Sequence, residues 1–173
     1  MKLNKERLIN LDSYDYKIIQ SIMNNGRITW AELASHIGLS SPAVADRVNR
    51  LISNGVIKEI GAKIDGENVG TGCAAFVTVS LEKPKYREEF LRLITNLEEV
   101  QECHHIAGDD DYLLKIRCRN TKDLDRVISY EIKSLEGVLR TKTTIVMDTM
   151  KETFKIPLQK DKFFIDEVGK NGK

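Results

Sequence analysis

Apolar residues recur every three or four positions through the first third of the chain, the spacing of a helix that buries one face. Three helices are predicted in this way, over about 12–25, 29–38 and 40–55. In the third, Val44, Val48, Leu51 and Ile52 line one face, and polar residues occupy the opposite one.

Start and stop signals for these helices are strong. N-cap residues precede each apolar stripe, a Thr-x-x-Glu capping box opens the second helix, and glycine follows each helix as a stop signal. Proline stands in the first turn of the third helix, where its missing N–H costs nothing. These signals lie at Asp12 and Gly26, at Thr29, Glu32 and Gly38, and at Ser40 or Ser41, Pro42 and Gly55.

The segment after the third helix reads as a tight two-stranded wing, with residues 56–60 and 63–65 joined by Gly61-Ala62. The turn Gly38-Leu39-Ser40 has the length that links the two crossing helices of a helix-turn-helix. Residues 1–65 are therefore predicted to form a winged helix-turn-helix DNA-binding domain.

From residue 73 onward the apolar period changes and predicts the order β-α-β-β-α-β, a ferredoxin-like unit. Its strands are expected at about 73–82, 100–107, 112–118 and 138–149. The predicted fold class is thus α+β. The predicted domains are a winged helix-turn-helix over 1–65, a glycine-rich hinge at 66–72, a ferredoxin-like effector and oligomerisation domain over 73–152, and a C-terminal extension over 153–173.

Two helices cover only one face of such a sheet. On the other face we expect Phe76, Cys103, Leu113 and Val146 among polar neighbours. A mixed face of this kind suits packing against the sheet of a second copy, so we predict a homo-oligomer, at least a dimer.

Composition narrows the class of protein. The chain has 173 residues, of which 41% are hydrophobic and 31% charged, as in globular domains. It has neither an apolar run of membrane-spanning length nor a secretory signal, so a cytoplasmic location is expected. Three widely spaced cysteines form no disulfide or zinc pattern, and Cys103 and His105 are only two ligands on one strand face. No metal or other cofactor is predicted.

Positive charge is slightly concentrated in the N-terminal third of the chain. The net charge is +1, and residues 1–65 carry nine basic and seven acidic residues. A monomer with so little positive charge would bind DNA poorly, so two or more copies are needed to neutralise enough phosphates of double-stranded DNA. The candidate DNA-binding residues are Ser40, Ser41, Pro42, Ala43, Asp46, Arg47 and Arg50 on the third helix, with Lys58 and Lys63 on the wing.

Each of these residues also has a structural interpretation. Arg47 would otherwise form an ion pair with Asp46 or Glu32, and Asp46 is better explained as a solvated or pairing group than as a base reader. Lys58 and Lys63 would either contact phosphates or lie solvated at the surface.

Two blocks of the sequence together resemble the Lrp/AsnC, or feast/famine, family of transcriptional regulators over roughly residues 8–152. The first block is Leu11-Asp12, Asp15, Ile18-Ile19, Asn25-Gly26-Arg27, Glu32-Leu33-Ala34, Gly38-Leu39-Ser40, Arg47-Val48, Arg50-Leu51 and Gly55-Val56-Ile57. The second is Glu102-Cys103-His104, Gly108-Asp109-Asp110-Asp111-Tyr112-Leu113-Leu114-Lys115, Gly137-Val138, Thr141-Lys142-Thr143 and Val146.

The resemblance implies dimers built by the C-terminal sheets, which are often assembled into octamers. It also implies that a small effector, commonly an amino acid, binds between dimers near the glycine turn at Gly108-Asp109-Asp110-Asp111. Effector binding would change assembly or DNA affinity. A regulator of this family is also expected to be prokaryotic and nucleoid-associated. The candidate effector residues are His104, Gly108, Asp109, Asp110, Asp111, Thr143 and Thr144. Aspartate is also common in tight turns for backbone reasons, and threonine in strands, so Asp111 is expected to be structural.

One departure concerns the effector. The family often has an aromatic residue at the position of Asp110, and three consecutive acids favour a cationic ligand over a leucine-like one. Two other functions stay open: an architectural DNA-wrapping protein, and an enzyme related to the sirohaem decarboxylases that share this two-domain form. Residues 73–79 are apolar and lack the histidines expected of that enzyme group, so no catalytic residues are predicted.

Overall fold

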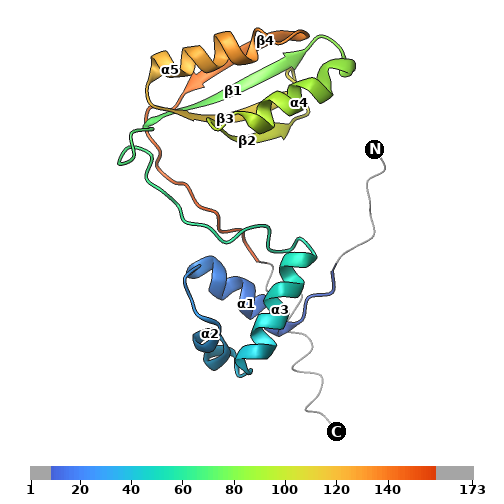
Figure 1. The fold of residues 1–173 in the computed structure, drawn as a ribbon, viewed down its shortest axis with the longest axis vertical. Coiled ribbons are helices and arrows are strands. Elements are labelled where there is room, and N and C mark those ends of the chain that lie inside the picture. The colour runs from blue at the N-terminus through green and yellow to red at the C-terminus, as the bar shows by residue number, and fades with distance from the viewer. Residues whose placement is uncertain (1–8, 159–173) are drawn as a thin grey trace. The chain divides into compact units, whose positions relative to one another are not determined.

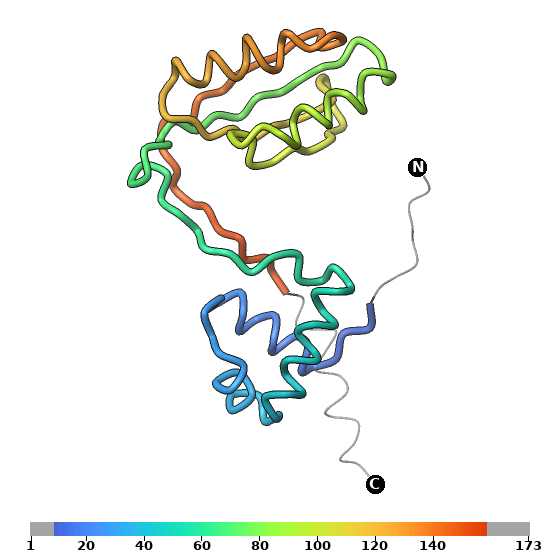
Figure 2. The backbone as a smooth tube through the Cα atoms, viewed as in Figure 1, coloured from blue at the N-terminus to red at the C-terminus, as the bar shows by residue number. Residues whose placement is uncertain are grey.

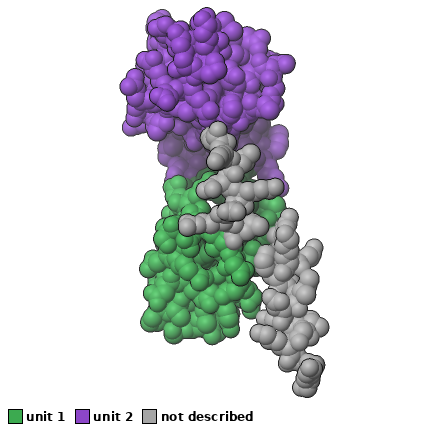
Figure 3. Space-filling model, turned by 90° about the vertical axis from the view of Figure 1, so that its right-hand side faces the viewer, with its two compact units in different colours: residues 1–63, 152–173 green, residues 64–151 purple. Residues whose placement is uncertain are grey.

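The computed structural model describes residues 9–158, which form two compact units (Figures 1 and 3). One unit combines residues 9–63 with residues 152–158, and the other comprises residues 64–151. The first is helical and the second is a sheet covered by helices, so the predicted α+β class is confirmed.

The first unit contains three helices, each of which begins at a predicted cap. The side chains of Asp12, Thr29 and Ser40 accept the backbone N–H three residues further on, at 2.9, 3.2 and 3.4 Å. Gly38 ends the second helix with φ of 76°, a conformation that favours glycine. The helices are α1 (Ser13–Asn24), α2 (Trp30–Ile37) and α3 (Ser41–Ser53).

The apolar stripes of the three helices meet in one small core. Val44, Val48 and Leu51 are buried as the spacing predicts, whereas Ile52 is 45% exposed and lies outside the core. The buried members are Ile18, Ile19, Ile22, Leu33, Ala34, Val44, Val48, Leu51 and Ile57.

The predicted pairing of two strands in the segment after α3 is wrong. No strand forms between residues 54 and 72 of the described chain. A two-residue hairpin needs positive φ in its turn, and neither Gly61 nor Ala62 has it. Ile57 instead turns into the helical core, while Ile60 and Ile64 are exposed.

The second unit is a sheet covered by helices. Its elements are β1 (Cys73–Leu81), a 3₁₀ turn (Pro84–Tyr86), α4 (Arg87–Asn96), β2 (Val100–His105), β3 (Tyr112–Cys118), α5 (Thr121–Arg126), a π-helical turn (Val127–Ile132) and β4 (Val138–Ile145) (Figure 1). The four strands form an antiparallel sheet of order β2-β3-β1-β4, which confirms the ferredoxin-like arrangement. Helices α4 and α5, and the turn that follows α5, contribute buried side chains to a single core with the sheet.

Strand register decides which residues face the helices. Phe76 stands opposite Thr144 and Lys115 on the open face of the sheet. Cys103 stands opposite Leu114 and packs against the helix-covered core, so its predicted place on the open face is wrong. The sequence assigned it to the wrong face because a register shift between Val100 and Glu102 changes the alternation in β2.

Residues 66–72, predicted as the hinge, form a compact loop within the second unit. The Asp65 carboxylate accepts the backbone N–H of Glu67 at 2.9 Å, and Thr71 N–H donates to the Gly66 carbonyl at 2.6 Å. Gly66 is buried, and a Cβ there would lie 2.5 Å from a guanidinium nitrogen of Arg117. The same Cβ would lie 2.9 Å from the backbone carbonyl oxygen of Thr71, which cannot move aside as a side chain can, so the loop favours glycine at this position.

The described part of the C-terminal extension returns to the helical unit, as the red end of the tube in Figure 2 shows. Glu152 accepts from Lys63 Nζ through its carbonyl at 2.6 Å and its carboxylate at 3.3 Å. Lys155 donates to the Asn24 side chain at 2.9 Å, and Leu158 packs against the helical core. The rest of the predicted extension, residues 159–173, lies outside the described residues.

Candidate functional site

Helix α3 presents a polar outer face. Pro42, Asp46 and Asn49 are exposed, and Ser41 and Ala43 are partly exposed near its N-terminal end. The side-chain oxygen of Ser40 is used as the helix cap. The face that can approach a base edge therefore carries short side chains at its start, as expected of a recognition helix whose N-terminal residues approach a groove.

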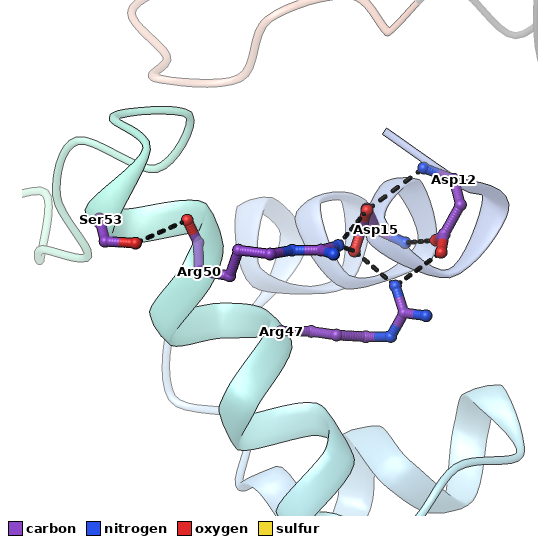
Figure 4. A network of polar contacts seen from close by, with 5 residues as sticks. All are labelled: Asp12, Asp15, Arg47, Arg50 and Ser53. Carbon is purple, nitrogen blue, oxygen red and sulfur yellow. Dashed lines mark hydrogen bonds and ion pairs between the residues drawn. The ribbon is translucent and has the colours of Figure 1, made fainter. Parts of the chain in front are cut away.

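Arg47 and Arg50 extend from the flank of α3 toward α1 (Figure 4). Arg47 Nη1 donates to Asp12 Oδ2 at 2.7 Å and to Asp15 Oδ1 at 2.8 Å. Arg50 Nη2 donates to both carboxylate oxygens of Asp15, at 2.8 and 2.7 Å. Both candidate DNA contacts are thus ion-paired to the first helix.

Asp15 is the centre of this cluster. Its side chain is fully buried, and it also accepts the Asp12 backbone N–H at 3.2 Å as the second half of a capping box. The carboxylates, first of Asp12 and then of Asp15, raise the pKa of the Arg47 guanidinium. Three donor groups thus satisfy the carboxylate, as a buried charge requires.

The alternative partners considered for Arg47 are wrong. Its carboxylates are Asp12 and Asp15, not Asp46 or Glu32, and Glu32 is engaged by Thr29 in the α2 capping box. Lys63 is paired with Glu152, whereas Lys58 is exposed. Of the two candidate lysines, only Lys58 has no ion-pair partner within residues 9–158.

The glycine turn at residues 106–111 is held firmly at one end of the sheet. Ile106 N–H donates to the Asp111 carbonyl at 2.9 Å, and the Asp111 side chain accepts Leu81 N–H at 2.7 Å. Asp111 thus supports the backbone. Gly108 and Asp109 are exposed at the tip of the turn.

Asp110 has polar partners on two strands. Its Oδ1 accepts from Ser80 Oγ at 2.6 Å and from Arg140 Nη2 at 2.8 Å. The hydroxyls of Ser80 and Thr78, followed by the Arg140 guanidinium, lower the pKa of Asp110 to about 2. Its charge is therefore balanced within the protein, which removes one of the three acids on which the expectation of a cationic ligand rested.

The remaining candidate effector residues do not converge within one copy of the chain. His104 lies on β2 and Thr144 on β4, at opposite edges of the sheet. Thr143 lies on the other face from Thr144, because neighbours along a strand alternate. A site that contains all of them would need residues from more than one copy.

Within residues 9–158 there is no group of three side chains able to hold a metal ion. The same part of the chain contains no helix with the length and apolar character needed to cross a membrane.

Comparison with known proteins shows what this arrangement belongs to. Residues 11–58 match the sequence profile of a winged helix-turn-helix DNA-binding domain, and residues 74–156 that of the Lrp/AsnC ligand binding domain. The proline dehydrogenase transcriptional activator of Rhizobium radiobacter is 36% identical over 87% of this chain and 97% of its own length. The chain belongs to the Lrp/AsnC family.

Solved structures of Lrp/AsnC regulators have the same fold. A transcriptional regulator from Neisseria meningitidis in complex with L-methionine matches with a TM-score of 0.79 and 29% identity, over 86% of this chain and 97% of the other. A feast or famine regulatory protein from M. tuberculosis complexed with L-methionine matches with a TM-score of 0.78 and 32% identity, over 85% and 99%. The protein is thus a DNA-binding transcriptional regulator, as the resemblance implied.

The sequence alone does not indicate the roles of four residues, two in the Asp15 ion-pair cluster and two that contact Asp110. The sequence indicates Asp12 as a helix cap and as part of the Lrp/AsnC resemblance, and Asp15 only as part of that resemblance. Ser80 and Arg140 contact Asp110 but were not candidates, although they are direct partners in the β1–β4 register. The signal that could have found them is alternation along both strands, once that register is known.

The lowered pKa of Asp110 predicts a pH-dependent stability. The pKa of an aspartate in an unfolded chain is about 3.9, and the pKa of folded Asp110 is about 2. The interactions of Asp110 therefore stabilise the fold fully above about pH 4, and that stability is lost as pH falls through about 2. Asp110→Asn should unfold at lower urea concentration than wild type at pH 7, and the gap should close near pH 2.

Urea unfolding of the full chain at several pH values between 7 and about 2 measures this gap. Asp109→Asn removes the neighbouring exposed carboxylate and controls for general charge effects. A gap that stays constant with pH would show that the partners of Asp110 do not hold its ionised form.

Proposed function

We propose that this regulator is a cytoplasmic, nucleoid-associated homo-oligomer whose assembly or DNA affinity responds to a free amino acid, and that it has no catalytic role. The observation that carries the proposal is the Lrp/AsnC ligand-binding domain at residues 74–156, together with related structures that contain L-methionine. Binding by α3 at the major groove is supported by its exposed outer face and short N-terminal side chains.

The proposed effector site includes the glycine turn. An amino acid carries a carboxylate and an ammonium group at one end, which require a cation and an anion. The exposed Asp109 would provide the anion. Arg140, which is 59% exposed and contacts Asp110 and the Asp109 carbonyl through Nη2, would bind the carboxylate with its remaining N–H groups. Oligomerisation would bring the other candidate residues, His104, Thr143 and Thr144, from neighbouring copies.

Light scattering and DNA binding on the same purified full chain test this proposal. L-methionine is the first ligand, followed by L-leucine and the other amino acids one at a time. We expect one of them to change the particle mass, or to change the Kd for a fluorescent duplex. Asp109→Asn should weaken the response, whereas Asp125→Asn, an exposed aspartate on α5, should not.

The experiment tests the amino-acid effector and DNA binding by α3 separately. A constant mass and a constant Kd with every amino acid would overturn the effector, and would favour the architectural role instead. Absence of duplex binding at low salt would contradict DNA binding by α3.

A further inference from the structure

Asp15 is a fully buried carboxylate on α1, outside the candidate DNA-binding residues, yet it holds two arginines of α3. Four contacts of 3.2 Å or less reach its two oxygens, three of them from guanidinium nitrogens. Helix packing alone does not require a charge at this position, since the core beneath it is apolar. The carboxylate therefore has a role in orienting the arginines.

The two arginines differ in the number of their bonding partners and in the exposure of their side chains. Arg47 bridges both carboxylates, lies 5.4 Å from the centre of the Tyr14 ring, and has a side chain that is 26% exposed. Arg50 contacts only Asp15, through Nη2, and its side chain is 51% exposed. Its Nε and Nη1 make no hydrogen bond to any residue in the range 9–158.

A guanidinium is planar and rigid, so fixing one nitrogen fixes the direction of the remaining donors. We propose that Asp15 is a positioning residue for DNA binding, which holds Arg50 through one nitrogen so that its free N–H groups bind a single backbone phosphate. The inference rests on the proposed binding of DNA by α3, and it adds a residue that itself does not touch DNA.

Local charge explains why positioning matters here. Asp12 and Asp15 carry two negative charges, and Arg47 and Arg50 carry two positive ones, so the cluster as a whole does not attract a phosphate. Binding then depends on directed N–H groups rather than on net charge. A lysine at position 50 would keep the charge but lose the planar fork, and should not substitute.

The experiment measures the Kd of the full chain for a fluorescent duplex of mixed sequence, about 30 base pairs long, at a series of salt concentrations. Arg50→Ala should weaken binding roughly tenfold or more, the loss expected for a charged hydrogen bond. It should also reduce the slope of log K against log salt by roughly one for each DNA-binding unit engaged. Arg50→Lys should weaken binding while keeping the wild-type slope.

Asp15 is tested by the isosteric Asp15→Asn, which should weaken binding without changing the slope. In the double variant with Arg50→Ala, Asp15→Asn should add much less than it costs alone, because Arg47, the other arginine bonded to Asp15, keeps its bond to Asp12. Arg92→Ala removes an exposed arginine of the ligand-binding unit and should change neither Kd nor slope. Circular dichroism confirms that each variant is folded at the assay temperature.

Different results with these variants would contradict different parts of the inference. If Arg50→Ala keeps the wild-type slope and Kd, Arg50 contacts no phosphate and the inference is wrong. Additive losses in the double variant would show that Asp15 does not act through Arg50. If Asp15→Asn does not fold, the comparison of Arg50→Ala with Arg50→Lys still decides whether a directed guanidinium is needed. Failure of the wild type to bind any duplex would instead overturn the proposed function.

Discussion

Replacing Asp15 with alanine should lower the free energy of unfolding of the DNA-binding unit by about 3 kcal/mol, at the lower end of the range for breaking a buried ion pair. The side chain is fully buried, and its loss leaves the Asp12 N–H and the Arg50 guanidinium without their acceptor, while Arg47 keeps only its bond to Asp12. The cost is at the lower end because Arg50 is half exposed and can turn toward water.

Urea unfolding followed by helical circular dichroism measures this loss, because the unit is helical. Asp12→Ala should cost less, about 1 kcal/mol, the usual value for losing a helix cap. Asp46→Ala, on the exposed face of α3, should change stability by less than about 0.5 kcal/mol. Equal effects at Asp15 and Asp46 would contradict a structural role for the buried carboxylate.

Phe90→Ala should destabilise the ligand-binding unit by about 3–5 kcal/mol, the range for removing a buried phenylalanine. Phe90 on α4 is fully buried, and its ring centre lies 4.7 Å from that of Tyr112 on β3. The ring therefore joins a covering helix to an inner strand, and alanine would leave a cavity between two layers that cannot easily collapse.

Thermal unfolding of the full chain checks this result, with an expected fall of roughly ten degrees or more in the Tm of the ligand-binding unit. The matched control is Phe154→Ala, because that ring is 76% exposed. It should leave both transitions nearly unchanged. An unaltered Tm for Phe90→Ala would mean that the α4 contact contributes little to the fold.

The elements best predicted from sequence were those fixed by local interactions. The caps at Asp12, Thr29 and Ser40 act over three residues, so their signal is contained in the sequence around them. The two strands predicted after α3 do not form, because alternation of apolar residues is only a weak local preference. Ile57 gains more by burial in the helical core than by pairing in a hairpin whose turn lacks positive φ.

The functional residues were harder to predict, because their partners are distant in the sequence. Arg47 lies 35 and 32 positions from the two carboxylates that bind it, and the sequence offers nearer acids such as Asp46. The contact of Arg140 with Asp110 likewise depends on β1, which stands between β3 and β4 in the sheet. Only the folded topology specifies these pairs.

The return of residues 152–158 to the helical unit makes the ligand-binding unit an insertion within the DNA-binding one. The chain leaves the helical unit after Lys63 and rejoins it at Glu152, and these two residues are bonded to each other. Neighbouring ends are the condition under which one domain can be spliced into another without disturbing its host. The ligand-binding unit is therefore inserted in a way that allows its replacement. A ligand-binding domain of different specificity, with similarly close termini, could be inserted between Lys63 and Glu152.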